Sequence, residues 1–209
     1  MTLILVRHGQ TEWNVLHRTQ GHMDSLLTQR GLLQAKLAGR AIAQFPIDRI
    51  YCSDSGRAIQ TAGIIAATNP AFPAPLHDKR LREMNFGEWE GLLRDQIIQS
   101  SPEEWSTYKA NPSAFRAPRG ESFSDLLVRV RDFLSDIEKQ SNPTCLAVSH
   151  ALLISTALLS VTGKEKPDFR DMSAIPEASI SILQNEKGHW TIVKASSTEH
   201  LRELDAENA

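Results

Sequence analysis

A short apolar run near the start of the chain, Leu3–Val6, is followed directly by Arg7, His8 and Gly9. Four consecutive apolar residues predict a buried strand. Open α/β sheets bind ligands at the carboxyl ends of their strands, and a glycine there lets the backbone turn without a Cβ in the way. A histidine beside a permanent cation at such a point is placed to attack phosphorus. Taken alone, the same residues could also be a strand that ends in solvated polar groups.

Other segments repeat the pattern of a strand followed by a helix. The apolar runs Ile47–Cys52 and Cys145–Ser149 predict two more buried strands. Ala178–Gln184 and Trp190–Ala195 alternate between apolar and polar residues, and Asn185–Gly188 between them is typical of a hairpin turn. Helices are expected over about Thr28–Gln44, Ser55–Ala67, Ser101 onward, Ser122 onward and Ala151–Val161. The order indicates an α/β fold, a three-layer sandwich with a mainly parallel central sheet flanked by helices.

Capping residues mark the start of two of these helices. Ser101 precedes Pro102 and Glu104, which predicts a serine cap, a proline in the first turn and a glutamate that completes a capping box. Ser122 and Asp125 repeat this pattern before a continuous apolar stripe. We therefore expect both segments to be helical.

The chain of 209 residues is long enough to form one domain with its own core. We expect a single domain over 1–209. The segment 91–120 interrupts the succession of sheet elements, so we expect it to be an excursion that roofs the site. The polar tail 199–209 is expected to be mobile.

The overall charge is nearly balanced, with 23 Lys and Arg against 25 Asp and Glu and a formal net charge of −2. A nucleic-acid-binding protein would show a basic field, so any phosphate site here must be a local cluster of cations. No stretch reaches the roughly 20 apolar residues of a membrane span, and we expect a cytoplasmic protein, monomeric or homodimeric. The two cysteines, Cys52 and Cys145, are expected to be buried thiols rather than a disulfide or metal ligands.

Three further motifs place polar groups near the ends of predicted strands. They are Ser53–Ala62, which contains Arg57; Leu81–Gly91, which contains Glu83; and Cys145–Ala151, which contains His150. Together with the Arg-His-Gly motif they resemble the histidine phosphatase superfamily, in the branch of cofactor-dependent phosphoglycerate mutases and their phosphatase relatives. The motifs occur in the family's order, and the resemblance covers nearly the whole chain.

The resemblance implies a covalent mechanism. His8 would accept the phosphoryl group, and water would then hydrolyse the N–P bond. Arg7 and Arg57 would hold the phosphoryl oxygens, because a planar guanidinium makes bidentate contacts with phosphate. His150 would donate a hydrogen bond to the group in transfer. Glu83 would protonate the leaving oxygen and then activate water.

The resemblance also implies residues that line the phosphate pocket. Asn14, Gln20 and Gly21 match such positions. Ala151 departs from the family pattern, in which glycine usually follows the second histidine. An alanine can still offer its N–H to phosphate, but it would be strained by about 1 kcal/mol or more if the position required a positive φ.

Other charged residues are less informative. Glu88 and Glu90 are expected to be exposed on a loop. Arg116 and Arg119 lie near the expected roof and could meet an acidic substrate, although a solvated surface role is equally compatible with the sequence. The histidines lack the acidic companions of a metal site, and the arginines already supply positive charge, so we expect no metal and no other cofactor.

The residues after Glu83 bear on the type of reaction. Phosphoglycerate mutases of this family generally carry Arg-His-Tyr there, whereas this chain has Met84, Asn85 and Phe86, and its insertion over the site is short. The stretch resembles the phosphatase branch, with similarity to broad-specificity phosphatases and to α-ribazole phosphatase. We expect hydrolysis of a small phosphorylated metabolite. Mutase-type transfer, or a phosphate-binding relative with little catalysis, are the alternatives.

Overall fold

A six-stranded mixed sheet forms the centre of the computed structural model, which describes residues 1–141, 143–162 and 175–206. The strands are β1 Thr2–Arg7, β2 Arg49–Cys52, β3 Leu76–His77, β4 Thr144–Ser149, β5 Ile180–Glu186 and β6 His189–Ser197. Their order is β3-β2-β4-β1-β5-β6. The first four are parallel, whereas β5 pairs antiparallel with both β1 and β6. The prediction of a mainly parallel sheet is confirmed.

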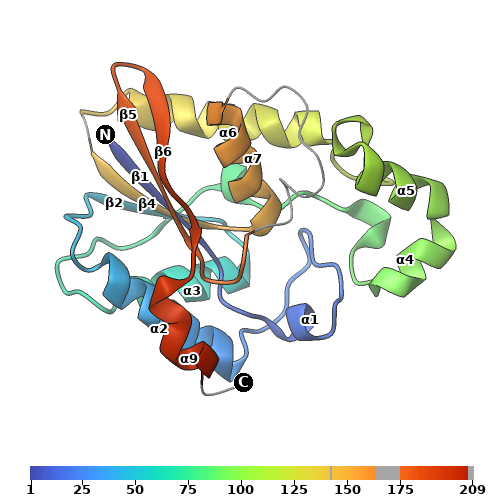
Figure 1. Cartoon of the computed structure of the whole chain (residues 1–209), viewed down its shortest axis with the longest axis horizontal. Coiled ribbons are helices and arrows are strands. Elements are labelled where there is room, and N and C mark those ends of the chain that lie inside the picture. The colour runs from blue at the N-terminus through green and yellow to red at the C-terminus, as the bar shows by residue number, and fades with distance from the viewer. Residues whose placement is uncertain (142, 163–174, 207–209) are drawn as a thin grey trace.

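Helices cover both faces of this sheet and produce three layers (Figure 1). On one side lie α2 Gln29–Ile42, α3 Gly56–Ala66 and α9 Arg202–Ala206; on the other lie α6 Phe123–Glu138 and α7 Ala151–Thr162. Within the described ranges no helix is long and apolar enough to cross a membrane. The α/β sandwich predicted from the order of elements is confirmed.

The central strands are buried on both faces, which explains their continuous apolar sequence. Leu3 and Leu5 of β1 pack into the cluster with α6 and α7, whereas Ile4 packs into the cluster with α2 and α3. Cys145 and Cys52 belong to these two clusters respectively, and both are free. Burial raises the pKa of each thiol to about 11, so both are the inert, protonated thiols that the sequence predicted.

Several predicted boundaries are shifted. The second strand begins at Arg49 rather than at Ile47. Ala178 precedes its strand and adopts a left-handed conformation with φ of 54°. The hairpin turn consists of Lys187 and Gly188 alone, both with positive φ, which matches the right-handed twist of the strands that they join. Strand β3 was not predicted because it contains only two exposed residues.

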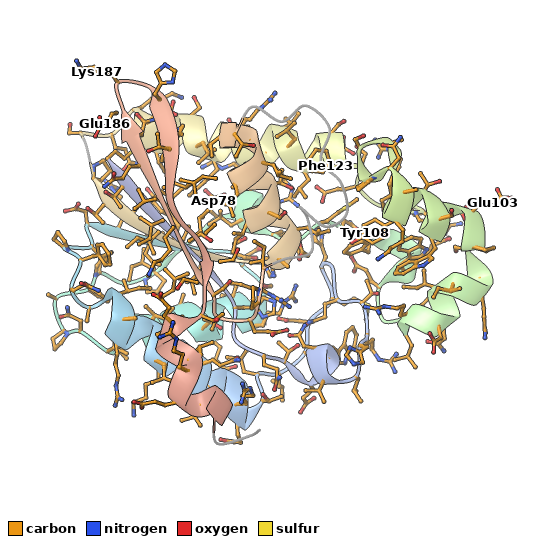
Figure 2. All side chains as sticks on the ribbon, viewed as in Figure 1. Asp78, Glu103, Tyr108, Phe123, Glu186 and Lys187 are labelled. Atoms are coloured by element: carbon orange, nitrogen blue, oxygen red, sulfur yellow. The ribbon has the colours of Figure 1, made fainter. Side chains whose placement is uncertain are left out.

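The segment 91–120 leaves the sheet and carries α4 Arg94–Ser100 and α5 Pro102–Ala110 (Figure 1). Figure 2 shows Glu103 at its outer end and Tyr108 nearer the body of the molecule. Aromatic rings join it to the preceding segment, since the Trp89 ring lies 4.9 Å from that of Phe115 and 5.9 Å from that of Tyr108. The sequence reading did not identify this aromatic cluster.

The two predicted caps differ in outcome. Ser122 caps α6 with a full capping box, in which Asp125 N–H donates to Ser122 Oγ at 3.2 Å and Ser122 N–H donates to Asp125 Oδ2 at 2.9 Å. The prediction of a capping box at Ser101 is wrong, because the Ser101 side chain makes no capping hydrogen bond. Ser101 instead ends α4 by donating its N–H to Ile97 O at 2.8 Å. Pro102 opens α5 as expected.

The described part of the tail, residues 199–206, is folded against the body of the protein. A 3-10 turn, Glu199–Leu201, leads into α9, and Leu201 and Leu204 are buried. His200 Nε2 donates to Ala178 O at 3.1 Å. Two leucines spaced three apart therefore anchor a segment whose composition is otherwise polar.

Gly9 is required by a close approach between backbones. A Cβ built on Gly9 would lie 2.4 Å from Gly31 O, and one on Gly31 would lie 2.1 Å from Gln10 O. The loop after β1 therefore rests directly on the first turn of α2. Because these neighbours are backbone atoms, they cannot move aside as a flexible side chain would.

We predict that Gly31→Ala destabilises the protein by about 1–3 kcal/mol through overpacking, although alanine normally favours a helix. Gly63→Ala is the matched control, because Gly63 is an exposed residue of α3 with no atom within 4 Å of a built Cβ. It should raise stability by about 0.5–1 kcal/mol. Urea unfolding of the two variants measures both effects, and stabilisation by Gly31→Ala would contradict the contact.

Candidate active site

The carboxyl ends of β1, β2 and β4 meet at one edge of the sheet. In the parallel pairing of β1 with β4, Arg7 is the partner of Ser149. His8 and His150, one residue further along each strand, are therefore neighbours, with ring centroids 5.2 Å apart. The backbone N–H of His8 donates to the backbone carbonyl of Ser149 at 2.9 Å, which continues the pairing of β1 with β4 into the loop.

A pocket of about 390 Å³ opens at this edge. The predicted site residues that line it are Arg7, His8, Asn14, Gln20, Gly21, Arg57, Glu83 and Ala151. His150, which we also expected in the pocket, is fully buried beside His8 and does not line it. Roof residues contribute as well, since Trp105 and Tyr108 of α5 are part of the lining. The sequence reading missed these two, and also Glu177 and Arg94.

The orientation of the His8 ring is fixed by one backbone carbonyl. Its Nδ1 lies 2.7 Å from Gly9 O. Because a carbonyl only accepts, Nδ1 carries the proton and Nε2 keeps its lone pair. Burial, together with the positive charges of Arg57 and Arg7, lowers the pKa of His8 well below its usual value. The ring is therefore neutral and able to act as a nucleophile at neutral pH.

His150 is fully buried, and its Nε2 lies 3.3 Å from Ser55 Oγ. Ser53 Oγ donates to Ser55 Oγ at 3.3 Å, so the Ser55 hydroxyl is free to donate to His150. His150 Nδ1 has no hydrogen-bond partner. Burial and the charge of Arg57 lower the pKa of this histidine well below its usual value too.

Arg57 lies in the first turn of α3, as predicted, and its side chain is 1% exposed. Its Nη1 donates to Met23 O at 2.7 Å and to Asp24 Oδ1 at 2.8 Å, and its Nη2 donates to Gly21 O at 2.8 Å. Its Nε is buried without a partner. The loop after β1 therefore holds this guanidinium in one position, and Asp24 compensates its charge.

Arg7 is held from the other side by the segment that leads into β5. Its Nη1 donates to Ile175 O at 2.7 Å, and its Nη2 forms an ion pair with Glu177 Oε1 at 3.2 Å. As in Arg57, Nε is buried without a partner. Both arginines thus keep an unused N–H donor while the rest of the guanidinium is fixed.

Glu83 faces the pocket next to the start of α7. Its Oε1 accepts from Met84 N–H at 2.9 Å and its Oε2 accepts from Leu152 N–H at 3.3 Å. Burial, with a smaller contribution from the charge of Glu83 nearby, raises the pKa of the Tyr108 hydroxyl in the roof. The carboxyl group is therefore anchored to the body of the protein and lies near the roof.

Glu90 has a structural role that the sequence reading did not anticipate, so its assignment as an exposed loop residue is wrong. Its Oε1 accepts from His22 N–H at 2.8 Å and from Phe86 N–H at 3.0 Å, and its Oε2 accepts from Met23 N–H at 3.1 Å. Gly21 has φ of 55°, and a Cβ there would lie 2.1 Å from Glu90 Oε1. Glu90 therefore fixes the loop whose carbonyls hold Arg57 of α3.

The charged residues near the roof that line the pocket are not the ones that the sequence suggested. Glu88 is exposed as predicted and pairs with Arg119 at 3.0 Å. Arg116 pairs with Asp125 at 2.9 Å. Neither Arg116 nor Arg119 lines the pocket; the arginine that the roof contributes is Arg94, which is exposed in the first turn of α4.

In the two predicted amide residues, Asn14 and Gln20, the side-chain oxygen already accepts a hydrogen bond from the protein. Asn14 Oδ1 accepts from Thr11 N–H at 3.0 Å, and Gln20 Oε1 accepts from Ser25 Oγ at 3.2 Å, so each side chain has its NH₂ group left to donate. Ala151 is the first residue of α7 and does not have a positive φ. Alanine in place of the usual glycine therefore causes no backbone strain.

The comparison with protein families decides the assignment. The model of the histidine phosphatase superfamily, branch 1, matches residues 3–198. The chain belongs to this superfamily. Phosphoserine phosphatase 1 of Hydrogenobacter thermophilus is 31% identical over 206 residues, with 98% of this chain and 96% of the relative covered.

A second relative is named for a different activity, that of a mutase. Probable phosphoglycerate mutase GpmB of Serratia proteamaculans is 33% identical over 194 residues, with 91% of this chain and 87% of the relative covered. The solved structure of Bacillus stearothermophilus YhfR superposes with a TM-score of 0.87 at 31% identity and covers 96% of this chain and 98% of that one. The prediction of the family from the four motifs is confirmed.

Family membership and relatives with phosphatase names make this chain a phosphomonoester hydrolase. A covalent phosphohistidine intermediate is typical of the family, which acts without metal ions. In the part of the chain that is described, no three His, Cys, Asp or Glu side chains gather in a way that could hold a metal ion.

We predict that stability falls as the pH drops below about 6.5, the usual pKa of histidine. The lowered pKa values of His8 and His150 mean that the unfolded chain binds more protons there. The stability gained by keeping the two histidines neutral is complete above their pKa in the unfolded chain. It is lost as the pH falls toward their lower pKa in the folded protein. Each histidine makes the free energy of unfolding fall by up to about 1.4 kcal/mol for each pH unit.

Urea unfolding between pH 7.5 and pH 5 tests this. The His150→Gln variant lacks one of the two titrating groups, so its free energy of unfolding should depend less steeply on pH than that of the unsubstituted protein. Identical slopes for the two proteins would show that burial of His150 does not exclude its charged form.

Proposed function

We propose that this chain hydrolyses phosphomonoesters with His8 Nε2 as the nucleophile. The observation that carries the proposal is the hydrogen bond of 2.7 Å between His8 Nδ1 and Gly9 O. It fixes the tautomer whose free lone pair is on Nε2, in a buried ring that lines the pocket together with Arg7 and Arg57.

In the first step Nε2 attacks phosphorus, the N–P bond forms and the P–O bond to the leaving group breaks. Arg7 and Arg57 stabilise the charge on the phosphoryl oxygens, because phosphoryl transfer depends chiefly on positioning and electrostatics. Their buried, unpartnered Nε atoms support this role. Glu83 transfers its proton to the leaving oxygen, so that an alcohol departs instead of an alkoxide.

In the second step Glu83, now ionised, takes a proton from water, and the resulting hydroxide attacks phosphorus. The N–P bond breaks, its electron pair returns to Nε2, and phosphate leaves. We assign His150, which lies beside His8 with the ring centroids 5.2 Å apart and not in the pocket lining, as a donor through Nδ1 to the phosphoryl group held on His8. The Ser53–Ser55 chain supports this, because a hydroxyl that donates to Nε2 leaves the proton of the neutral ring on Nδ1.

Hydrolysis is favoured over mutase transfer by the residues that follow Glu83. Met84 is 1% exposed and Phe86 is 9% exposed, and the N–H of Asn85 donates to Glu121 Oε2 at 2.8 Å. None of the three offers a cation that would hold a second acidic group of the substrate. We propose a small phosphorylated metabolite as the substrate, Asn14 and Gln20 as amide donors to it, and a single cytoplasmic domain roofed by 91–120.

We predict that His8→Ala abolishes hydrolysis of every phosphomonoester, measured in buffer that contains EDTA. Rapid quenching of the unsubstituted enzyme with ³²P-labelled substrate should trap a phosphoenzyme that survives base and is lost in acid, as phosphohistidine is. Near-normal turnover by a folded His8→Ala protein, or a phosphoenzyme with the opposite stability, would contradict the covalent mechanism.

A second prediction concerns the acid. Glu83→Gln should slow phosphoenzyme formation from an alkyl phosphate by about 10²–10⁴-fold, and much less from an aryl phosphate, whose phenolate leaves without help. Single-turnover measurements separate this step from the later attack of water. Glu88→Gln is the control, since Glu88 is exposed and outside the pocket. Equal losses for both substrate types would remove Glu83 from the acid role.

A further inference from the structure

The pocket contains an acidic side chain that the proposed mechanism does not use. Glu177 lines it, with a side chain that is 29% exposed, and pairs with Arg7 at 3.2 Å. We propose that Glu177 determines substrate specificity, in that it favours phosphomonoesters whose leaving group carries an ammonium group near the ester oxygen. This inference rests on the proposed function, because it concerns the leaving group in the same pocket.

The backbone around Glu177 is held firmly. Ala178 N–H donates to His8 O at 3.2 Å, and Arg7 N–H donates to Ser179 O at 3.3 Å. On the outer side Ala178 O accepts from His200 at 3.1 Å. Ala178 itself is in the left-handed region that L-residues rarely adopt, and such strain persists only where surrounding contacts impose it. Glu177 is therefore a fixed feature of the wall.

The position of Glu177 relates directly to where a substrate would bind. Its carboxylate contacts the guanidinium of Arg7, to which we have assigned the phosphoryl oxygens. Glu177 also lines the same pocket as Glu83, to which we have assigned the leaving oxygen, so a leaving group held there shares the cavity with the Glu177 carboxylate. An ammonium group two carbons from the ester oxygen can therefore approach the carboxylate, whereas a carboxyl group at the same place would be repelled by it.

Apart from Arg94, the other charges at the pocket are engaged by groups of the protein. Arg57 is compensated by Asp24. Arg18 stacks on Trp13 at 5.5 Å and donates to the Gly91 carbonyl. The exposed cation Arg94 belongs to α4 of the roof. Glu83, the other carboxyl group of the pocket, holds the leaving oxygen itself in the proposed mechanism.

The substrate charge can be varied at nearly constant size. O-phosphoethanolamine carries an ammonium group, 2-hydroxyethyl phosphate is the neutral analogue, and phosphoglycolate carries a carboxylate. We would measure kcat/KM for each with the unsubstituted enzyme, with Glu177→Gln and with Glu88→Gln. Glu88 is a matched control, because it also pairs with an arginine but does not line the pocket.

In Glu177→Gln, the ratio of kcat/KM for phosphoethanolamine to that for hydroxyethyl phosphate should fall about three- to tenfold, and the corresponding ratio for phosphoglycolate should rise by a similar factor. Glu88→Gln should change neither ratio. A residue that only positioned Arg7 would alter all three substrates equally, so unchanged ratios in Glu177→Gln would overturn the inference.

A measurement on the unsubstituted enzyme covers the case in which the variant does not fold. Salt screens charge interactions, so the phosphoethanolamine ratio should decrease as NaCl is raised from 20 to 500 mM, and a constant ratio would contradict the inference. Hydrolysis of hydroxyethyl phosphate reports the proposed function by itself. If it is absent, the function and the inference both fail; if it is present with salt-independent ratios, only the inference fails.

Discussion

The parallel pairing of β1 with β4 is the constraint on which the rest of the site depends. Arg7 of β1 is paired with Ser149 of β4. The next residue after each strand is a histidine, so the two rings meet. A shift of one position would reverse the side chains of a strand between the two faces of the sheet. Leu3 and Leu5 face one core and Ile4 the other, so such a shift would also turn Arg7 and His8 toward the opposite faces.

Each arginine of the site is held by groups of the protein before any substrate binds. Asp24 and two carbonyls hold Arg57, and Glu177 and one carbonyl hold Arg7. Removing a guanidinium from water is costly unless it is paired, so these partners make the buried cations stable. They also set the direction in which the remaining N–H groups point, which is the preorganisation that electrostatic catalysis requires.

Local patterns in the sequence predicted every strand of the sheet except β3, most helices and the four family motifs, because each depends on a few consecutive residues. Contacts between distant residues could not be predicted in this way. Glu88 and Glu90 have similar surroundings in the sequence, yet only Glu90 accepts three backbone N–H groups, two of them from the loop after β1. Glu177 belongs to no motif, and its importance is visible only when the chain brings it to Arg7.

The anchoring of Ala178 by His200 has a consequence for how the protein is made. His8 emerges from the ribosome early, but Glu177 lies about 170 residues further along the chain, which takes roughly 10–30 seconds to translate. Its support comes from a turn translated later still. A nascent chain therefore carries His8 and Arg7 outside the ribosome well before the residues that hold Arg7 have been made, and this side of the pocket can form only near the end of synthesis.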